Sequence, residues 1–500
     1  MGGRNRKRGH SESSGVRLAT ILAVGTAVVF ATFSKPTLAQ QADWSGESGQ
    51  TVSVANISLS SLMERIEALE YQVVRQSEEL YDIKEIDIVT KPTITIFGRA
   101  FIDYWAFPSD SPLVNWVGSQ WPDSTAAPPP TIGNPNSFIG FRRLRLGAKG
   151  QVSETMEYKL QLEFAQPDFT TLKDAYLGWL NLPWNDKFLI GNQKRPYGLA
   201  HLDSSRYMVF MERPLMIAAF SNGGSARRLG VQAYGYSQNE RWNWRYGANL
   251  MQNISTLGRI ESNNFEPELA GRIANTLWYD EMSGGRGYAH WGLSGAACFP
   301  NGGAEARFRT RPEAYSDTRW YDTGQITNGE TYQLGGVEGL ININRLSVVG
   351  EYMSVQMQRS GGASDLNFHG GYVYVAYFLT NDFTTWDRKR GILDRTYPNE
   401  NFFVVRTEDG SRARGWGAWQ IAGRYSHGDF NSGGIDGGIG NSFTFALNWW
   451  WNPYARMQFN YINGQISDRN TGTTGQNPLP AGTGTSGDYN ILGTRFMVYW

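Results

Sequence analysis

The stretch Asn490–Trp500 reads N-I-L-G-T-R-F-M-V-Y-W and is the last part of the sequence. Its residues alternate between two faces, one with Leu492, Thr494, Phe496, Val498 and Trp500 and the other with Gly493, Arg495, Met497 and Tyr499. This period of two predicts a strand with one apolar face and one face that bears charge. A strand that ends on an aromatic residue is typical of the closing strand of a bacterial outer-membrane barrel, where one face meets lipid.

The composition favours the same class of protein. Charged residues are 18% and aromatic residues 14% of the chain, with 58 Gly, 18 Trp and 25 Tyr, whereas a typical soluble chain has about 25% charged residues. The mean hydropathy is negative, which excludes a protein built from membrane-spanning helices. A single cysteine, Cys298, excludes an intramolecular disulfide.

The first residues form a targeting segment. A basic start is followed by the apolar run Leu18–Phe33 and by the small-residue cleavage site Thr37-Leu38-Ala39. We expect a signal peptide over 1–39, since the apolar run is short for a membrane span. The remaining chain has 40 Lys and Arg and 45 Asp and Glu, a net charge near −5. A preference for anions would therefore depend on the local placement of arginines.

A helical segment precedes the strands. Residues 40–56 are polar and predict a flexible leader. Within 57–90, apolar residues recur at spacings of three and four from Leu59 to Ile83, with one polar interruption at Gln76. This heptad pattern predicts a short oligomeric coiled coil in the periplasm, and a single amphipathic surface helix is the alternative.

From Thr93 onward the period is two, and the pattern predicts an all-β fold: a 16-stranded antiparallel transmembrane barrel over 93–500. We place the strands at 93–105, 138–150, 155–166, 171–182, 186–195, 226–238, 241–253, 267–281, 286–298, 330–342, 345–358, 367–380, 414–428, 440–451, 453–466 and 489–500. Long and short connectors alternate, as they do in outer-membrane barrels. The connector 381–413 is long where a short turn is expected, so it either hides two strands or folds elsewhere, such as into the lumen.

Arginines in the connectors are the first candidates for a pore function. Arg307, Arg309 and Arg311 alternate in the connector 299–329, which would put three guanidinium groups on one face about 6–7 Å apart. Rows of arginine select anions in pores because the group stays charged and binds oxyanions through two hydrogen bonds. A charged loop surface, or ion pairs with Glu305 and Glu313, is the alternative.

Further basic candidates lie on predicted strands and in two other long connectors. Arg143 and Arg145 alternate with Leu144 and Leu146 and should face the lumen. The remaining candidates adjoin the connector 196–225 or lie in the connector 381–413, and they are Lys194, Arg195, Arg412 and Arg414. Structural ion pairs with acidic residues of the lumen are the alternative for residues on the strands.

Signals for catalysis or a cofactor are weak. Four histidines remain after residue 39, and their spacing fits no metal site. The chain contains no G-x-S-x-G turn and no phosphate-binding glycine loop. We therefore expect neither an enzyme nor a cofactor or metal.

Several fragments resemble the phosphate-selective porin O and P family. They are Arg142–Gly150 (R-R-L-R-L-G-A-K-G), Asp174–Trp179 (D-A-Y-L-G-W), Gly191–Gly198 (G-N-Q-K-R-P-Y-G), Arg307–Pro312, Tyr321–Gly324 and Trp416–Ser426 (W-G-A-W-Q-I-A-G-R-Y-S). The resemblance implies a trimer of 16-stranded barrels whose pore is narrowed by connectors and lined by an arginine ladder, with Arg307, Arg309 and Arg311 as the alternating part. The family's Leu-Thr-Gly-Glu pattern reads Leu379-Thr380-Asn381-Asp382 here, so phosphate specificity stays open.

Together these features predict an outer-membrane porin for the passive diffusion of small inorganic anions. Its partners would be outer-membrane lipid and two further copies of the chain, with no nucleic acid. A general or weakly cation-preferring porin is one alternative, because the chain without its signal peptide is net negative. A barrel with a role in adhesion or envelope tethering is the other.

Overall fold

A computed structural model describes residues 68, 69, 71, 75, 92–108, 111–119, 135–165, 169–221, 227–252, 254, 265–300, 307–406, 410–470 and 479–500. The chain divides into two units, Met1–Ser58 and Leu59–Trp500, and every described residue belongs to the second. The predicted signal peptide and leader lie outside the described residues. Of the predicted coiled coil, only residues 68, 69, 71 and 75 are described, and all four are helical.

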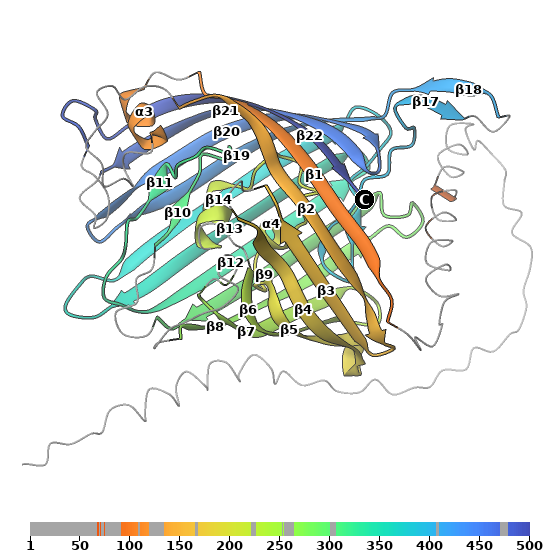
Figure 1. Cartoon of the computed structure of the whole chain (residues 1–500), viewed down its shortest axis with the longest axis horizontal. Helices are drawn as coiled ribbons and strands as arrows, with labels where there is room; N and C mark the ends of the chain where they lie inside the picture. The colour runs from red at the N-terminus through yellow and green to blue at the C-terminus, as the bar shows by residue number, and fades with distance from the viewer. Residues whose placement is uncertain are drawn as a thin grey trace, which may run out of the picture. The chain divides into compact units, whose positions relative to one another are not determined.

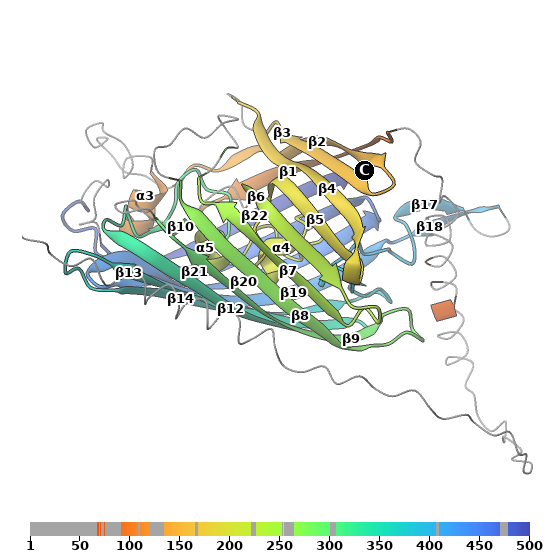
Figure 2. The ribbon, with the colours of Figure 1, turned by 90° about the horizontal axis from the view of Figure 1, so that it is seen from below.

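Sixteen antiparallel strands form a closed barrel (Figures 1 and 2). They are β1 (Thr95–Ala106), β2 (Phe138–Ser153), β3 (Met156–Glu163), β4 (Thr171–Leu182), β5 (Asp186–Lys194), β6 (Arg227–Tyr236), β7 (Trp242–Leu250), β8 (Pro267–Tyr279), β9 (Gly287–Cys298), β12 (Gly329–Ile343), β13 (Leu346–Arg359), β14 (Leu366–Phe378), β19 (Ala418–Ser432), β20 (Ile435–Asn452), β21 (Ala455–Arg469) and β22 (Gly487–Tyr499). Each pairs with the next, and β22 closes the ring on β1. The predicted barrel and its strand number are confirmed.

Alternation along each strand separates a lumen face from an outer face. On β21, Gln458 and Asn460 are buried in the lumen, while the alternate residues Phe459 and Tyr461 are exposed on the outside. Strand side chains point to opposite faces in turn, so this sequence pattern fixes which residues face the lumen and which face outward. Among the described residues, no helix is long and apolar enough to cross a membrane.

Two long connectors fill the lumen from one rim. Loop 195–226 joins β5 to β6 and contains α4 (Leu199–Leu202) and α5 (Leu215–Phe220). Loop 299–328 joins β9 to β12 and contains the two-residue strands β10 (Arg309–Thr310) and β11 (Tyr321–Asp322). Phe220 of α5 packs against Phe308 at 5.8 Å between ring centroids, so the two loops support each other. A short helix, α3 (Pro112–Gly118), lies in the connector between β1 and β2.

The connector 379–417 enters from the opposite rim and has two parts. Its first part contains β15 (Trp386–Asp387) and β16 (Ile392–Leu393) and lies against the lumen face of β8 and β9. There the indole of Trp386 donates to Thr276 Oγ1 at 3.1 Å and the hydroxyl of Tyr288 donates to Thr384 O at 2.9 Å. The second part is a separate hairpin of β17 (Phe403–Arg406) and β18 (Arg412–Gly415).

This division resolves the two possibilities for the connector. The segment adds no strand to the barrel, and its first part folds into the lumen. It reaches loop 195–226, because Leu393 N donates to Asp203 Oδ1 at 3.0 Å. Segments from opposite rims therefore meet inside the barrel, and both views show α4 within the ring of strands (Figures 1 and 2).

Candidate functional site

The lumen holds a cavity of about 650 Å³ between the wall of β1 to β7 and the three inserted segments. Its lining has four acidic residues, Glu163, Asp174, Glu212 and Glu313. It has fifteen basic residues, which are Arg99, Arg142, Arg143, Arg145, Lys159, Lys173, Lys194, Arg206, Arg213, Arg227, Arg245, Arg309, Arg311, Arg319 and Arg390. The cavity therefore carries a strong positive excess, although the chain as a whole is neutral.

Some of these charges are neutralised by carboxylates of the cavity wall. Arg145 Nε lies 2.6 Å from Glu163 Oε2, and Lys159 Nζ lies 2.6 Å from Asp174 Oδ2. Arg227 also pairs with Asp174. Two further lining arginines are ion-paired. Arg142 pairs with the lining residue Glu212, and Arg390 pairs with Asp387, which is not a lining residue.

Nine lining residues form no ion pair within the described part of the chain. They are Arg99, Arg143, Lys173, Lys194, Arg206, Arg213, Arg245, Arg309 and Arg311. Several are held by neutral groups instead: Arg99 donates to Ser205 Oγ at 2.9 Å, and Arg213 donates to the carbonyls of Ala200 and Asp203. The charges of these nine residues are therefore not neutralised by a carboxylate within the described residues.

A bulge in β2 brings adjacent arginines to the same side of the wall. In the pairing of β1 with β2, Phe101 faces Arg143 and Ile102 faces Phe141, so Arg142 is the extra residue. Arg142 and Arg143 both line the cavity, whereas strict alternation would have turned Arg142 to the outside. The predicted lumen positions of Arg143 and Arg145 agree with the structure.

The three alternating arginines of loop 299–328 do not all face the cavity. Arg309 and Arg311 line the cavity. Arg307 instead forms a two-pronged ion pair with Asp322, with Nε 2.7 Å from Oδ1 and Nη2 2.5 Å from Oδ2. It is not among the residues that line the cavity. The alternative partner Glu313 binds Arg424, with Arg424 Nη2 at 2.8 Å from Glu313 Oε2.

Charge crowding is greatest around Arg311 and Arg319, both in loop 299–328. Burial, together with the charges of Arg319 and Arg142, lowers the pKa of Arg311 to about 9. Burial and the charges of Arg309 and Arg142 lower the pKa of Arg319 to about 10. Both shifts arise because like charges are brought together in a poorly hydrated place, an arrangement that a bound anion would relieve.

Lys194 and Arg195 have structural partners. Lys194 Nζ lines the cavity but donates to the carbonyl oxygens of His201, Leu202 and Asp203 at 2.9, 2.7 and 2.9 Å, at the C-terminal end of α4. Arg195 is buried away from the cavity lining, with Nη1 2.7 Å from Glu268 Oε2.

Arg412 and Arg414 lie on β18, both exposed, and neither lines the cavity. The structure thus places them away from the lumen to which the sequence pattern assigned them. The pattern located the connector 381–413 but could not show where it divides into an inserted segment and a separate hairpin.

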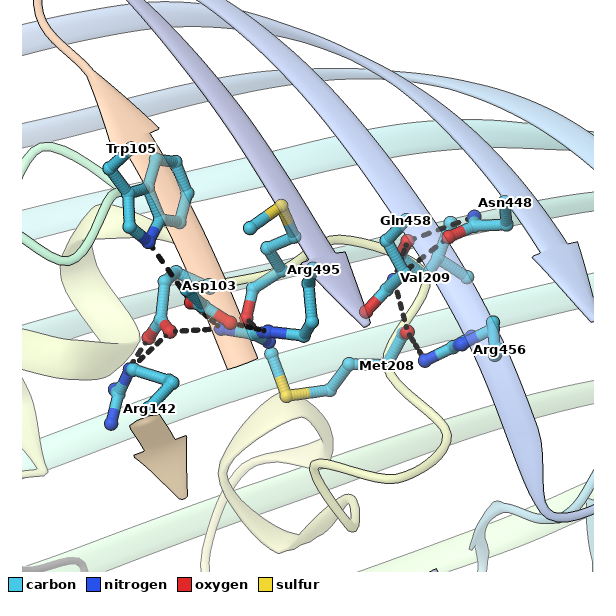
Figure 3. A network of polar contacts seen from close by, with 11 residues as sticks. Asp103, Trp105, Arg142, Met208, Val209, Asn448, Arg456, Gln458 and Arg495 are labelled. Carbon is cyan, nitrogen blue, oxygen red and sulfur yellow. Dashed lines mark hydrogen bonds and ion pairs between the residues drawn. The ribbon is translucent and has the colours of Figure 1, made fainter. Parts of the chain in front are cut away.

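Polar contacts from the barrel wall fix loop 195–226 (Figure 3). Arg495 of β22 donates to the carbonyl of Met211 and, at 2.9 Å, to Glu212 Oε1. On the neighbouring strands, Arg456 donates to Met208 O at 2.9 Å, and both Gln458 and Asn448 donate to Val209 O at 3.0 Å. These bonds hold the backbone that narrows the lumen.

Glu212 is the centre of this anchor. It accepts two hydrogen bonds from Arg142, at 2.6 and 2.8 Å, in addition to the one from Arg495. Burial alone would raise the pKa of this carboxyl, but the guanidinium groups of Arg142 and Arg495 bring the pKa below its usual range. Glu212 is therefore ionised, and it joins loop 195–226 to both β2 and β22.

Several lining residues are not among the candidates from the sequence, for example Arg99, Arg213 and Arg319. Arg99 lies on β1, and nothing in the sequence distinguishes it from arginines that form ion pairs. Arg213 and Arg319 depend on the fold of long loops. Within the described ranges, no group of His, Cys, Asp and Glu could hold a metal ion.

Comparisons with known proteins give a family. The sequence profile of the family "Phosphate-selective porin O and P" matches residues 119–500. An uncharacterized protein of Caulobacter vibrioides (strain ATCC 19089 / CIP 103742 / CB 15) is 27% identical over 331 residues, which are 64% of this chain and 62% of that protein. The chain thus matches less than two thirds of that relative's length.

Solved structures with a similar course of the chain are also found. An anion-selective porin from Comamonas acidovorans has 12% identity and a TM-score of 0.49, covering 82% of this chain and all of that one. The outer-membrane channel DcaP of Acinetobacter baumannii has 12% identity and a TM-score of 0.47, covering 82% and 98%. OmpT of Vibrio cholerae in its trimer form has 12% identity and a TM-score of 0.46, covering 82% and 100%.

The family match covers most of the chain. It includes fifteen of the sixteen strands and all three inserted segments that line the cavity. A closed 16-stranded barrel with a basic lumen accords with it. The chain therefore belongs to the phosphate-selective porin O and P family of outer-membrane porins.

Proposed function

We propose that the protein is a diffusion porin that prefers small anions. One observation carries the proposal: of fifteen basic residues around the cavity, nine form no ion pair within the described residues. A lumen whose basic groups were all paired with carboxylates would have little preference. Here the excess charge raises the local concentration of anions and repels cations.

The mechanism is passive. An anion entering from the rim of loop 299–328 meets Arg309 and Arg311, and then the wall residue Arg143. Guanidinium groups replace part of its hydration shell, and because several stand close together the anion can exchange one for the next. We assign these three arginines to the anion pathway, and we leave out Arg145 because Glu163 neutralises it. Arg307, Arg195, Arg412 and Arg414 are left out of it, since they are ion-paired or lie outside the cavity lining.

The solutes we propose are small inorganic anions as a class, with phosphate among them. Selectivity for phosphate over other anions would need a site of its own. Lys194 was the nearest lysine candidate for such a site, but its three donors are already bonded to carbonyl oxygens. Lys173 is a lining lysine without a hydrogen bond or ion pair from its side chain within the described ranges.

We further propose a homotrimer in the outer membrane, with the heptad segment 57–90 in the periplasm and no catalytic activity. Family membership supports this arrangement, as do the apolar outward faces of the strands. Cross-linking of the protein in native membranes would count the subunits.

The test of anion preference is the reversal potential across a planar bilayer under a potassium chloride gradient. We expect the wild type to prefer chloride, and the cavity variant Arg143→Ala/Arg309→Ala to lose much of this preference. The matched control, Arg412→Ala/Arg414→Ala, removes the same charge from β18 and should behave as wild type. A wild type that prefers potassium would overturn the proposal, and an equal loss in both variants would overturn the assignment of the pathway.

A further inference from the structure

Three guanidinium groups of the cavity that form no ion pair within the described residues lie over tyrosine rings. The Cζ atom of Arg311 lies 4.4 Å from the ring centroid of Tyr315. Arg245 lies 5.0 Å from the ring of Tyr234, and Arg206 lies 5.7 Å from the ring of Tyr499. All three arginines are among the nine lining residues without an ion pair in the described part of the chain.

A ring and a carboxylate hold a guanidinium group with different consequences. A carboxylate carries a full negative charge, so the pair it forms is neutral and has little left to attract a passing anion. An aromatic ring attracts the cation through its quadrupole but has no net charge. A guanidinium group held by a ring is therefore positioned and keeps its whole charge for a solute.

Tyr315 shows this arrangement most clearly, because it serves two arginines. Arg142 of β2 also lies 4.4 Å from its ring centroid, so both guanidinium groups contact the same ring. The ring is itself held by Phe138, with centroids 5.8 Å apart in an edge-on arrangement. Arg142 is ion-paired with Glu212, whereas among the described residues the side chain of Arg311 donates to the carbonyl of Ser316 and to no carboxylate.

We propose that Tyr315 and Tyr234 are positioning residues for anion passage, whose rings hold Arg311 and Arg245 in the lumen without neutralising them. This inference rests on the proposed function and adds to it. Arg311 is crowded by Arg319 and Arg142, so without the ring it would be repelled from its place. The anion preference then depends on uncharged residues as well as on the arginines.

The variants are Tyr315→Leu, Tyr315→Phe and Tyr234→Leu, each measured as the chloride-to-potassium permeability ratio from reversal potentials. Phenylalanine keeps the ring face and lacks the hydroxyl, so Tyr315→Phe should match the wild type. Leucine removes the ring, and the ratio should fall by at least about twofold, as expected for loss of a partly buried cation–π contact. Tyr246→Leu, on the outward face of β7 beside Arg245, is the matched control and should not change the ratio.

A second measurement separates positioning from general loosening of the barrel. On an Arg311→Ala background, Tyr315→Leu should change the ratio much less than it does in the wild type, because the ring acts through Arg311. If Tyr315→Leu does not yield folded channels, Tyr234→Leu on β6 provides the test instead.

The outcomes are distinct. An unchanged ratio in folded Tyr315→Leu or Tyr234→Leu channels overturns this inference while leaving an anion-preferring wild type intact. An equal loss in Tyr315→Phe and Tyr315→Leu also overturns it, since the hydroxyl would then be the active group. A wild type that prefers potassium overturns both the inference and the proposed function.

Discussion

Arg495 of the last strand and Asp103 of the first strand form a two-pronged ion pair, with Nε–Oδ1 and Nη2–Oδ2 distances of 2.7 Å each. The two residues are direct partners in the register of β22 with β1. Both side chains are about 1% exposed, and the indole of Trp105 donates to Asp103 as well. The pair therefore joins the two ends of the sheet inside the lumen, where water competes little.

We expect Asp103→Asn to destabilise the barrel by about 1.5–3 kcal/mol, because Arg495 loses its charged hydrogen bonds to β1 but keeps Glu212 as a charged partner. The heat-induced unfolding midpoint in detergent, read from electrophoretic mobility, should fall. The double variant Asp103→Leu/Arg495→Met removes both charges and should recover part of the loss. A single variant with the wild-type midpoint would show that the pair does not hold the closure.

Two of the three lining lysines, Lys194 and Lys173, should give opposite results. Lys194→Met removes the donor to the carbonyl oxygens of His201 and Leu202, which costs about 1–3 kcal/mol for each group that stays buried and unsatisfied, whereas Asp203 O keeps the hydrogen bond from Arg213. Lys173→Met removes a charge whose side chain has no hydrogen bond or ion pair within the described ranges. We therefore expect Lys194→Met mainly to lower the unfolding midpoint and Lys173→Met mainly to lower the chloride preference. The reverse order would contradict these roles.

Asp203 should make stability depend on pH. Burial raises its pKa to about 7, against the opposing effects of the Leu393 N–H, Lys194 and Arg213, and with a further contribution from Glu338. The usual value is about 3.9. Since the folded state holds this proton more tightly, the contribution to stability is present below pH 4 and is lost as the pH rises from about 4 to 7.

The matched variant is Asp203→Asn, which stays neutral and can still accept the hydrogen bond from Leu393. Relative to this variant, the wild type should lose up to about 1.4 kcal/mol of unfolding free energy per pH unit between pH 4 and 7. Unfolding midpoints at pH 4.5, 6 and 8 measure the difference. Parallel curves for the two proteins would contradict the raised pKa.

Glu212 is one of the four acidic residues that line the cavity, and it opposes the passage of anions. Glu212→Gln should raise the chloride-to-potassium permeability ratio roughly twofold, since one charge about 8 Å away in water contributes about 0.5 kcal/mol. Reversal potentials measure the ratio, and Glu330→Gln, on an exposed position of β12, is the control. A fall in the ratio would indicate that Glu212 acts chiefly by holding loop 195–226.

The barrel was predictable because its signal is local and repeated. Each strand carries its own alternation, as in Gln458 to Tyr461, and all sixteen predicted strands correspond to strands of the barrel within a few residues. The positions of Arg143 and Arg145 follow from the same alternation.

The lumen was less predictable because its contacts join residues far apart in the sequence. Arg142 reaches the lumen through a bulge that depends on pairing with β1. Lys194 and Arg195 are adjacent in sequence, but one binds carbonyls of α4 and the other binds Glu268 of β8. The spacing of basic residues cannot tell which arginine is paired with a carboxylate, as Arg307 is with Asp322 of the same loop, and which contacts only an aromatic ring.

The contacts of Arg495 have a consequence for how the protein is assembled. The same side chain binds Asp103 on the opposite end of the sheet and Met211 and Glu212 of loop 195–226. Closure of the sheet and the position of the loop that narrows the lumen therefore depend on the same guanidinium group. A change that displaces Arg495 would loosen the seam of the barrel and the loop inside it together.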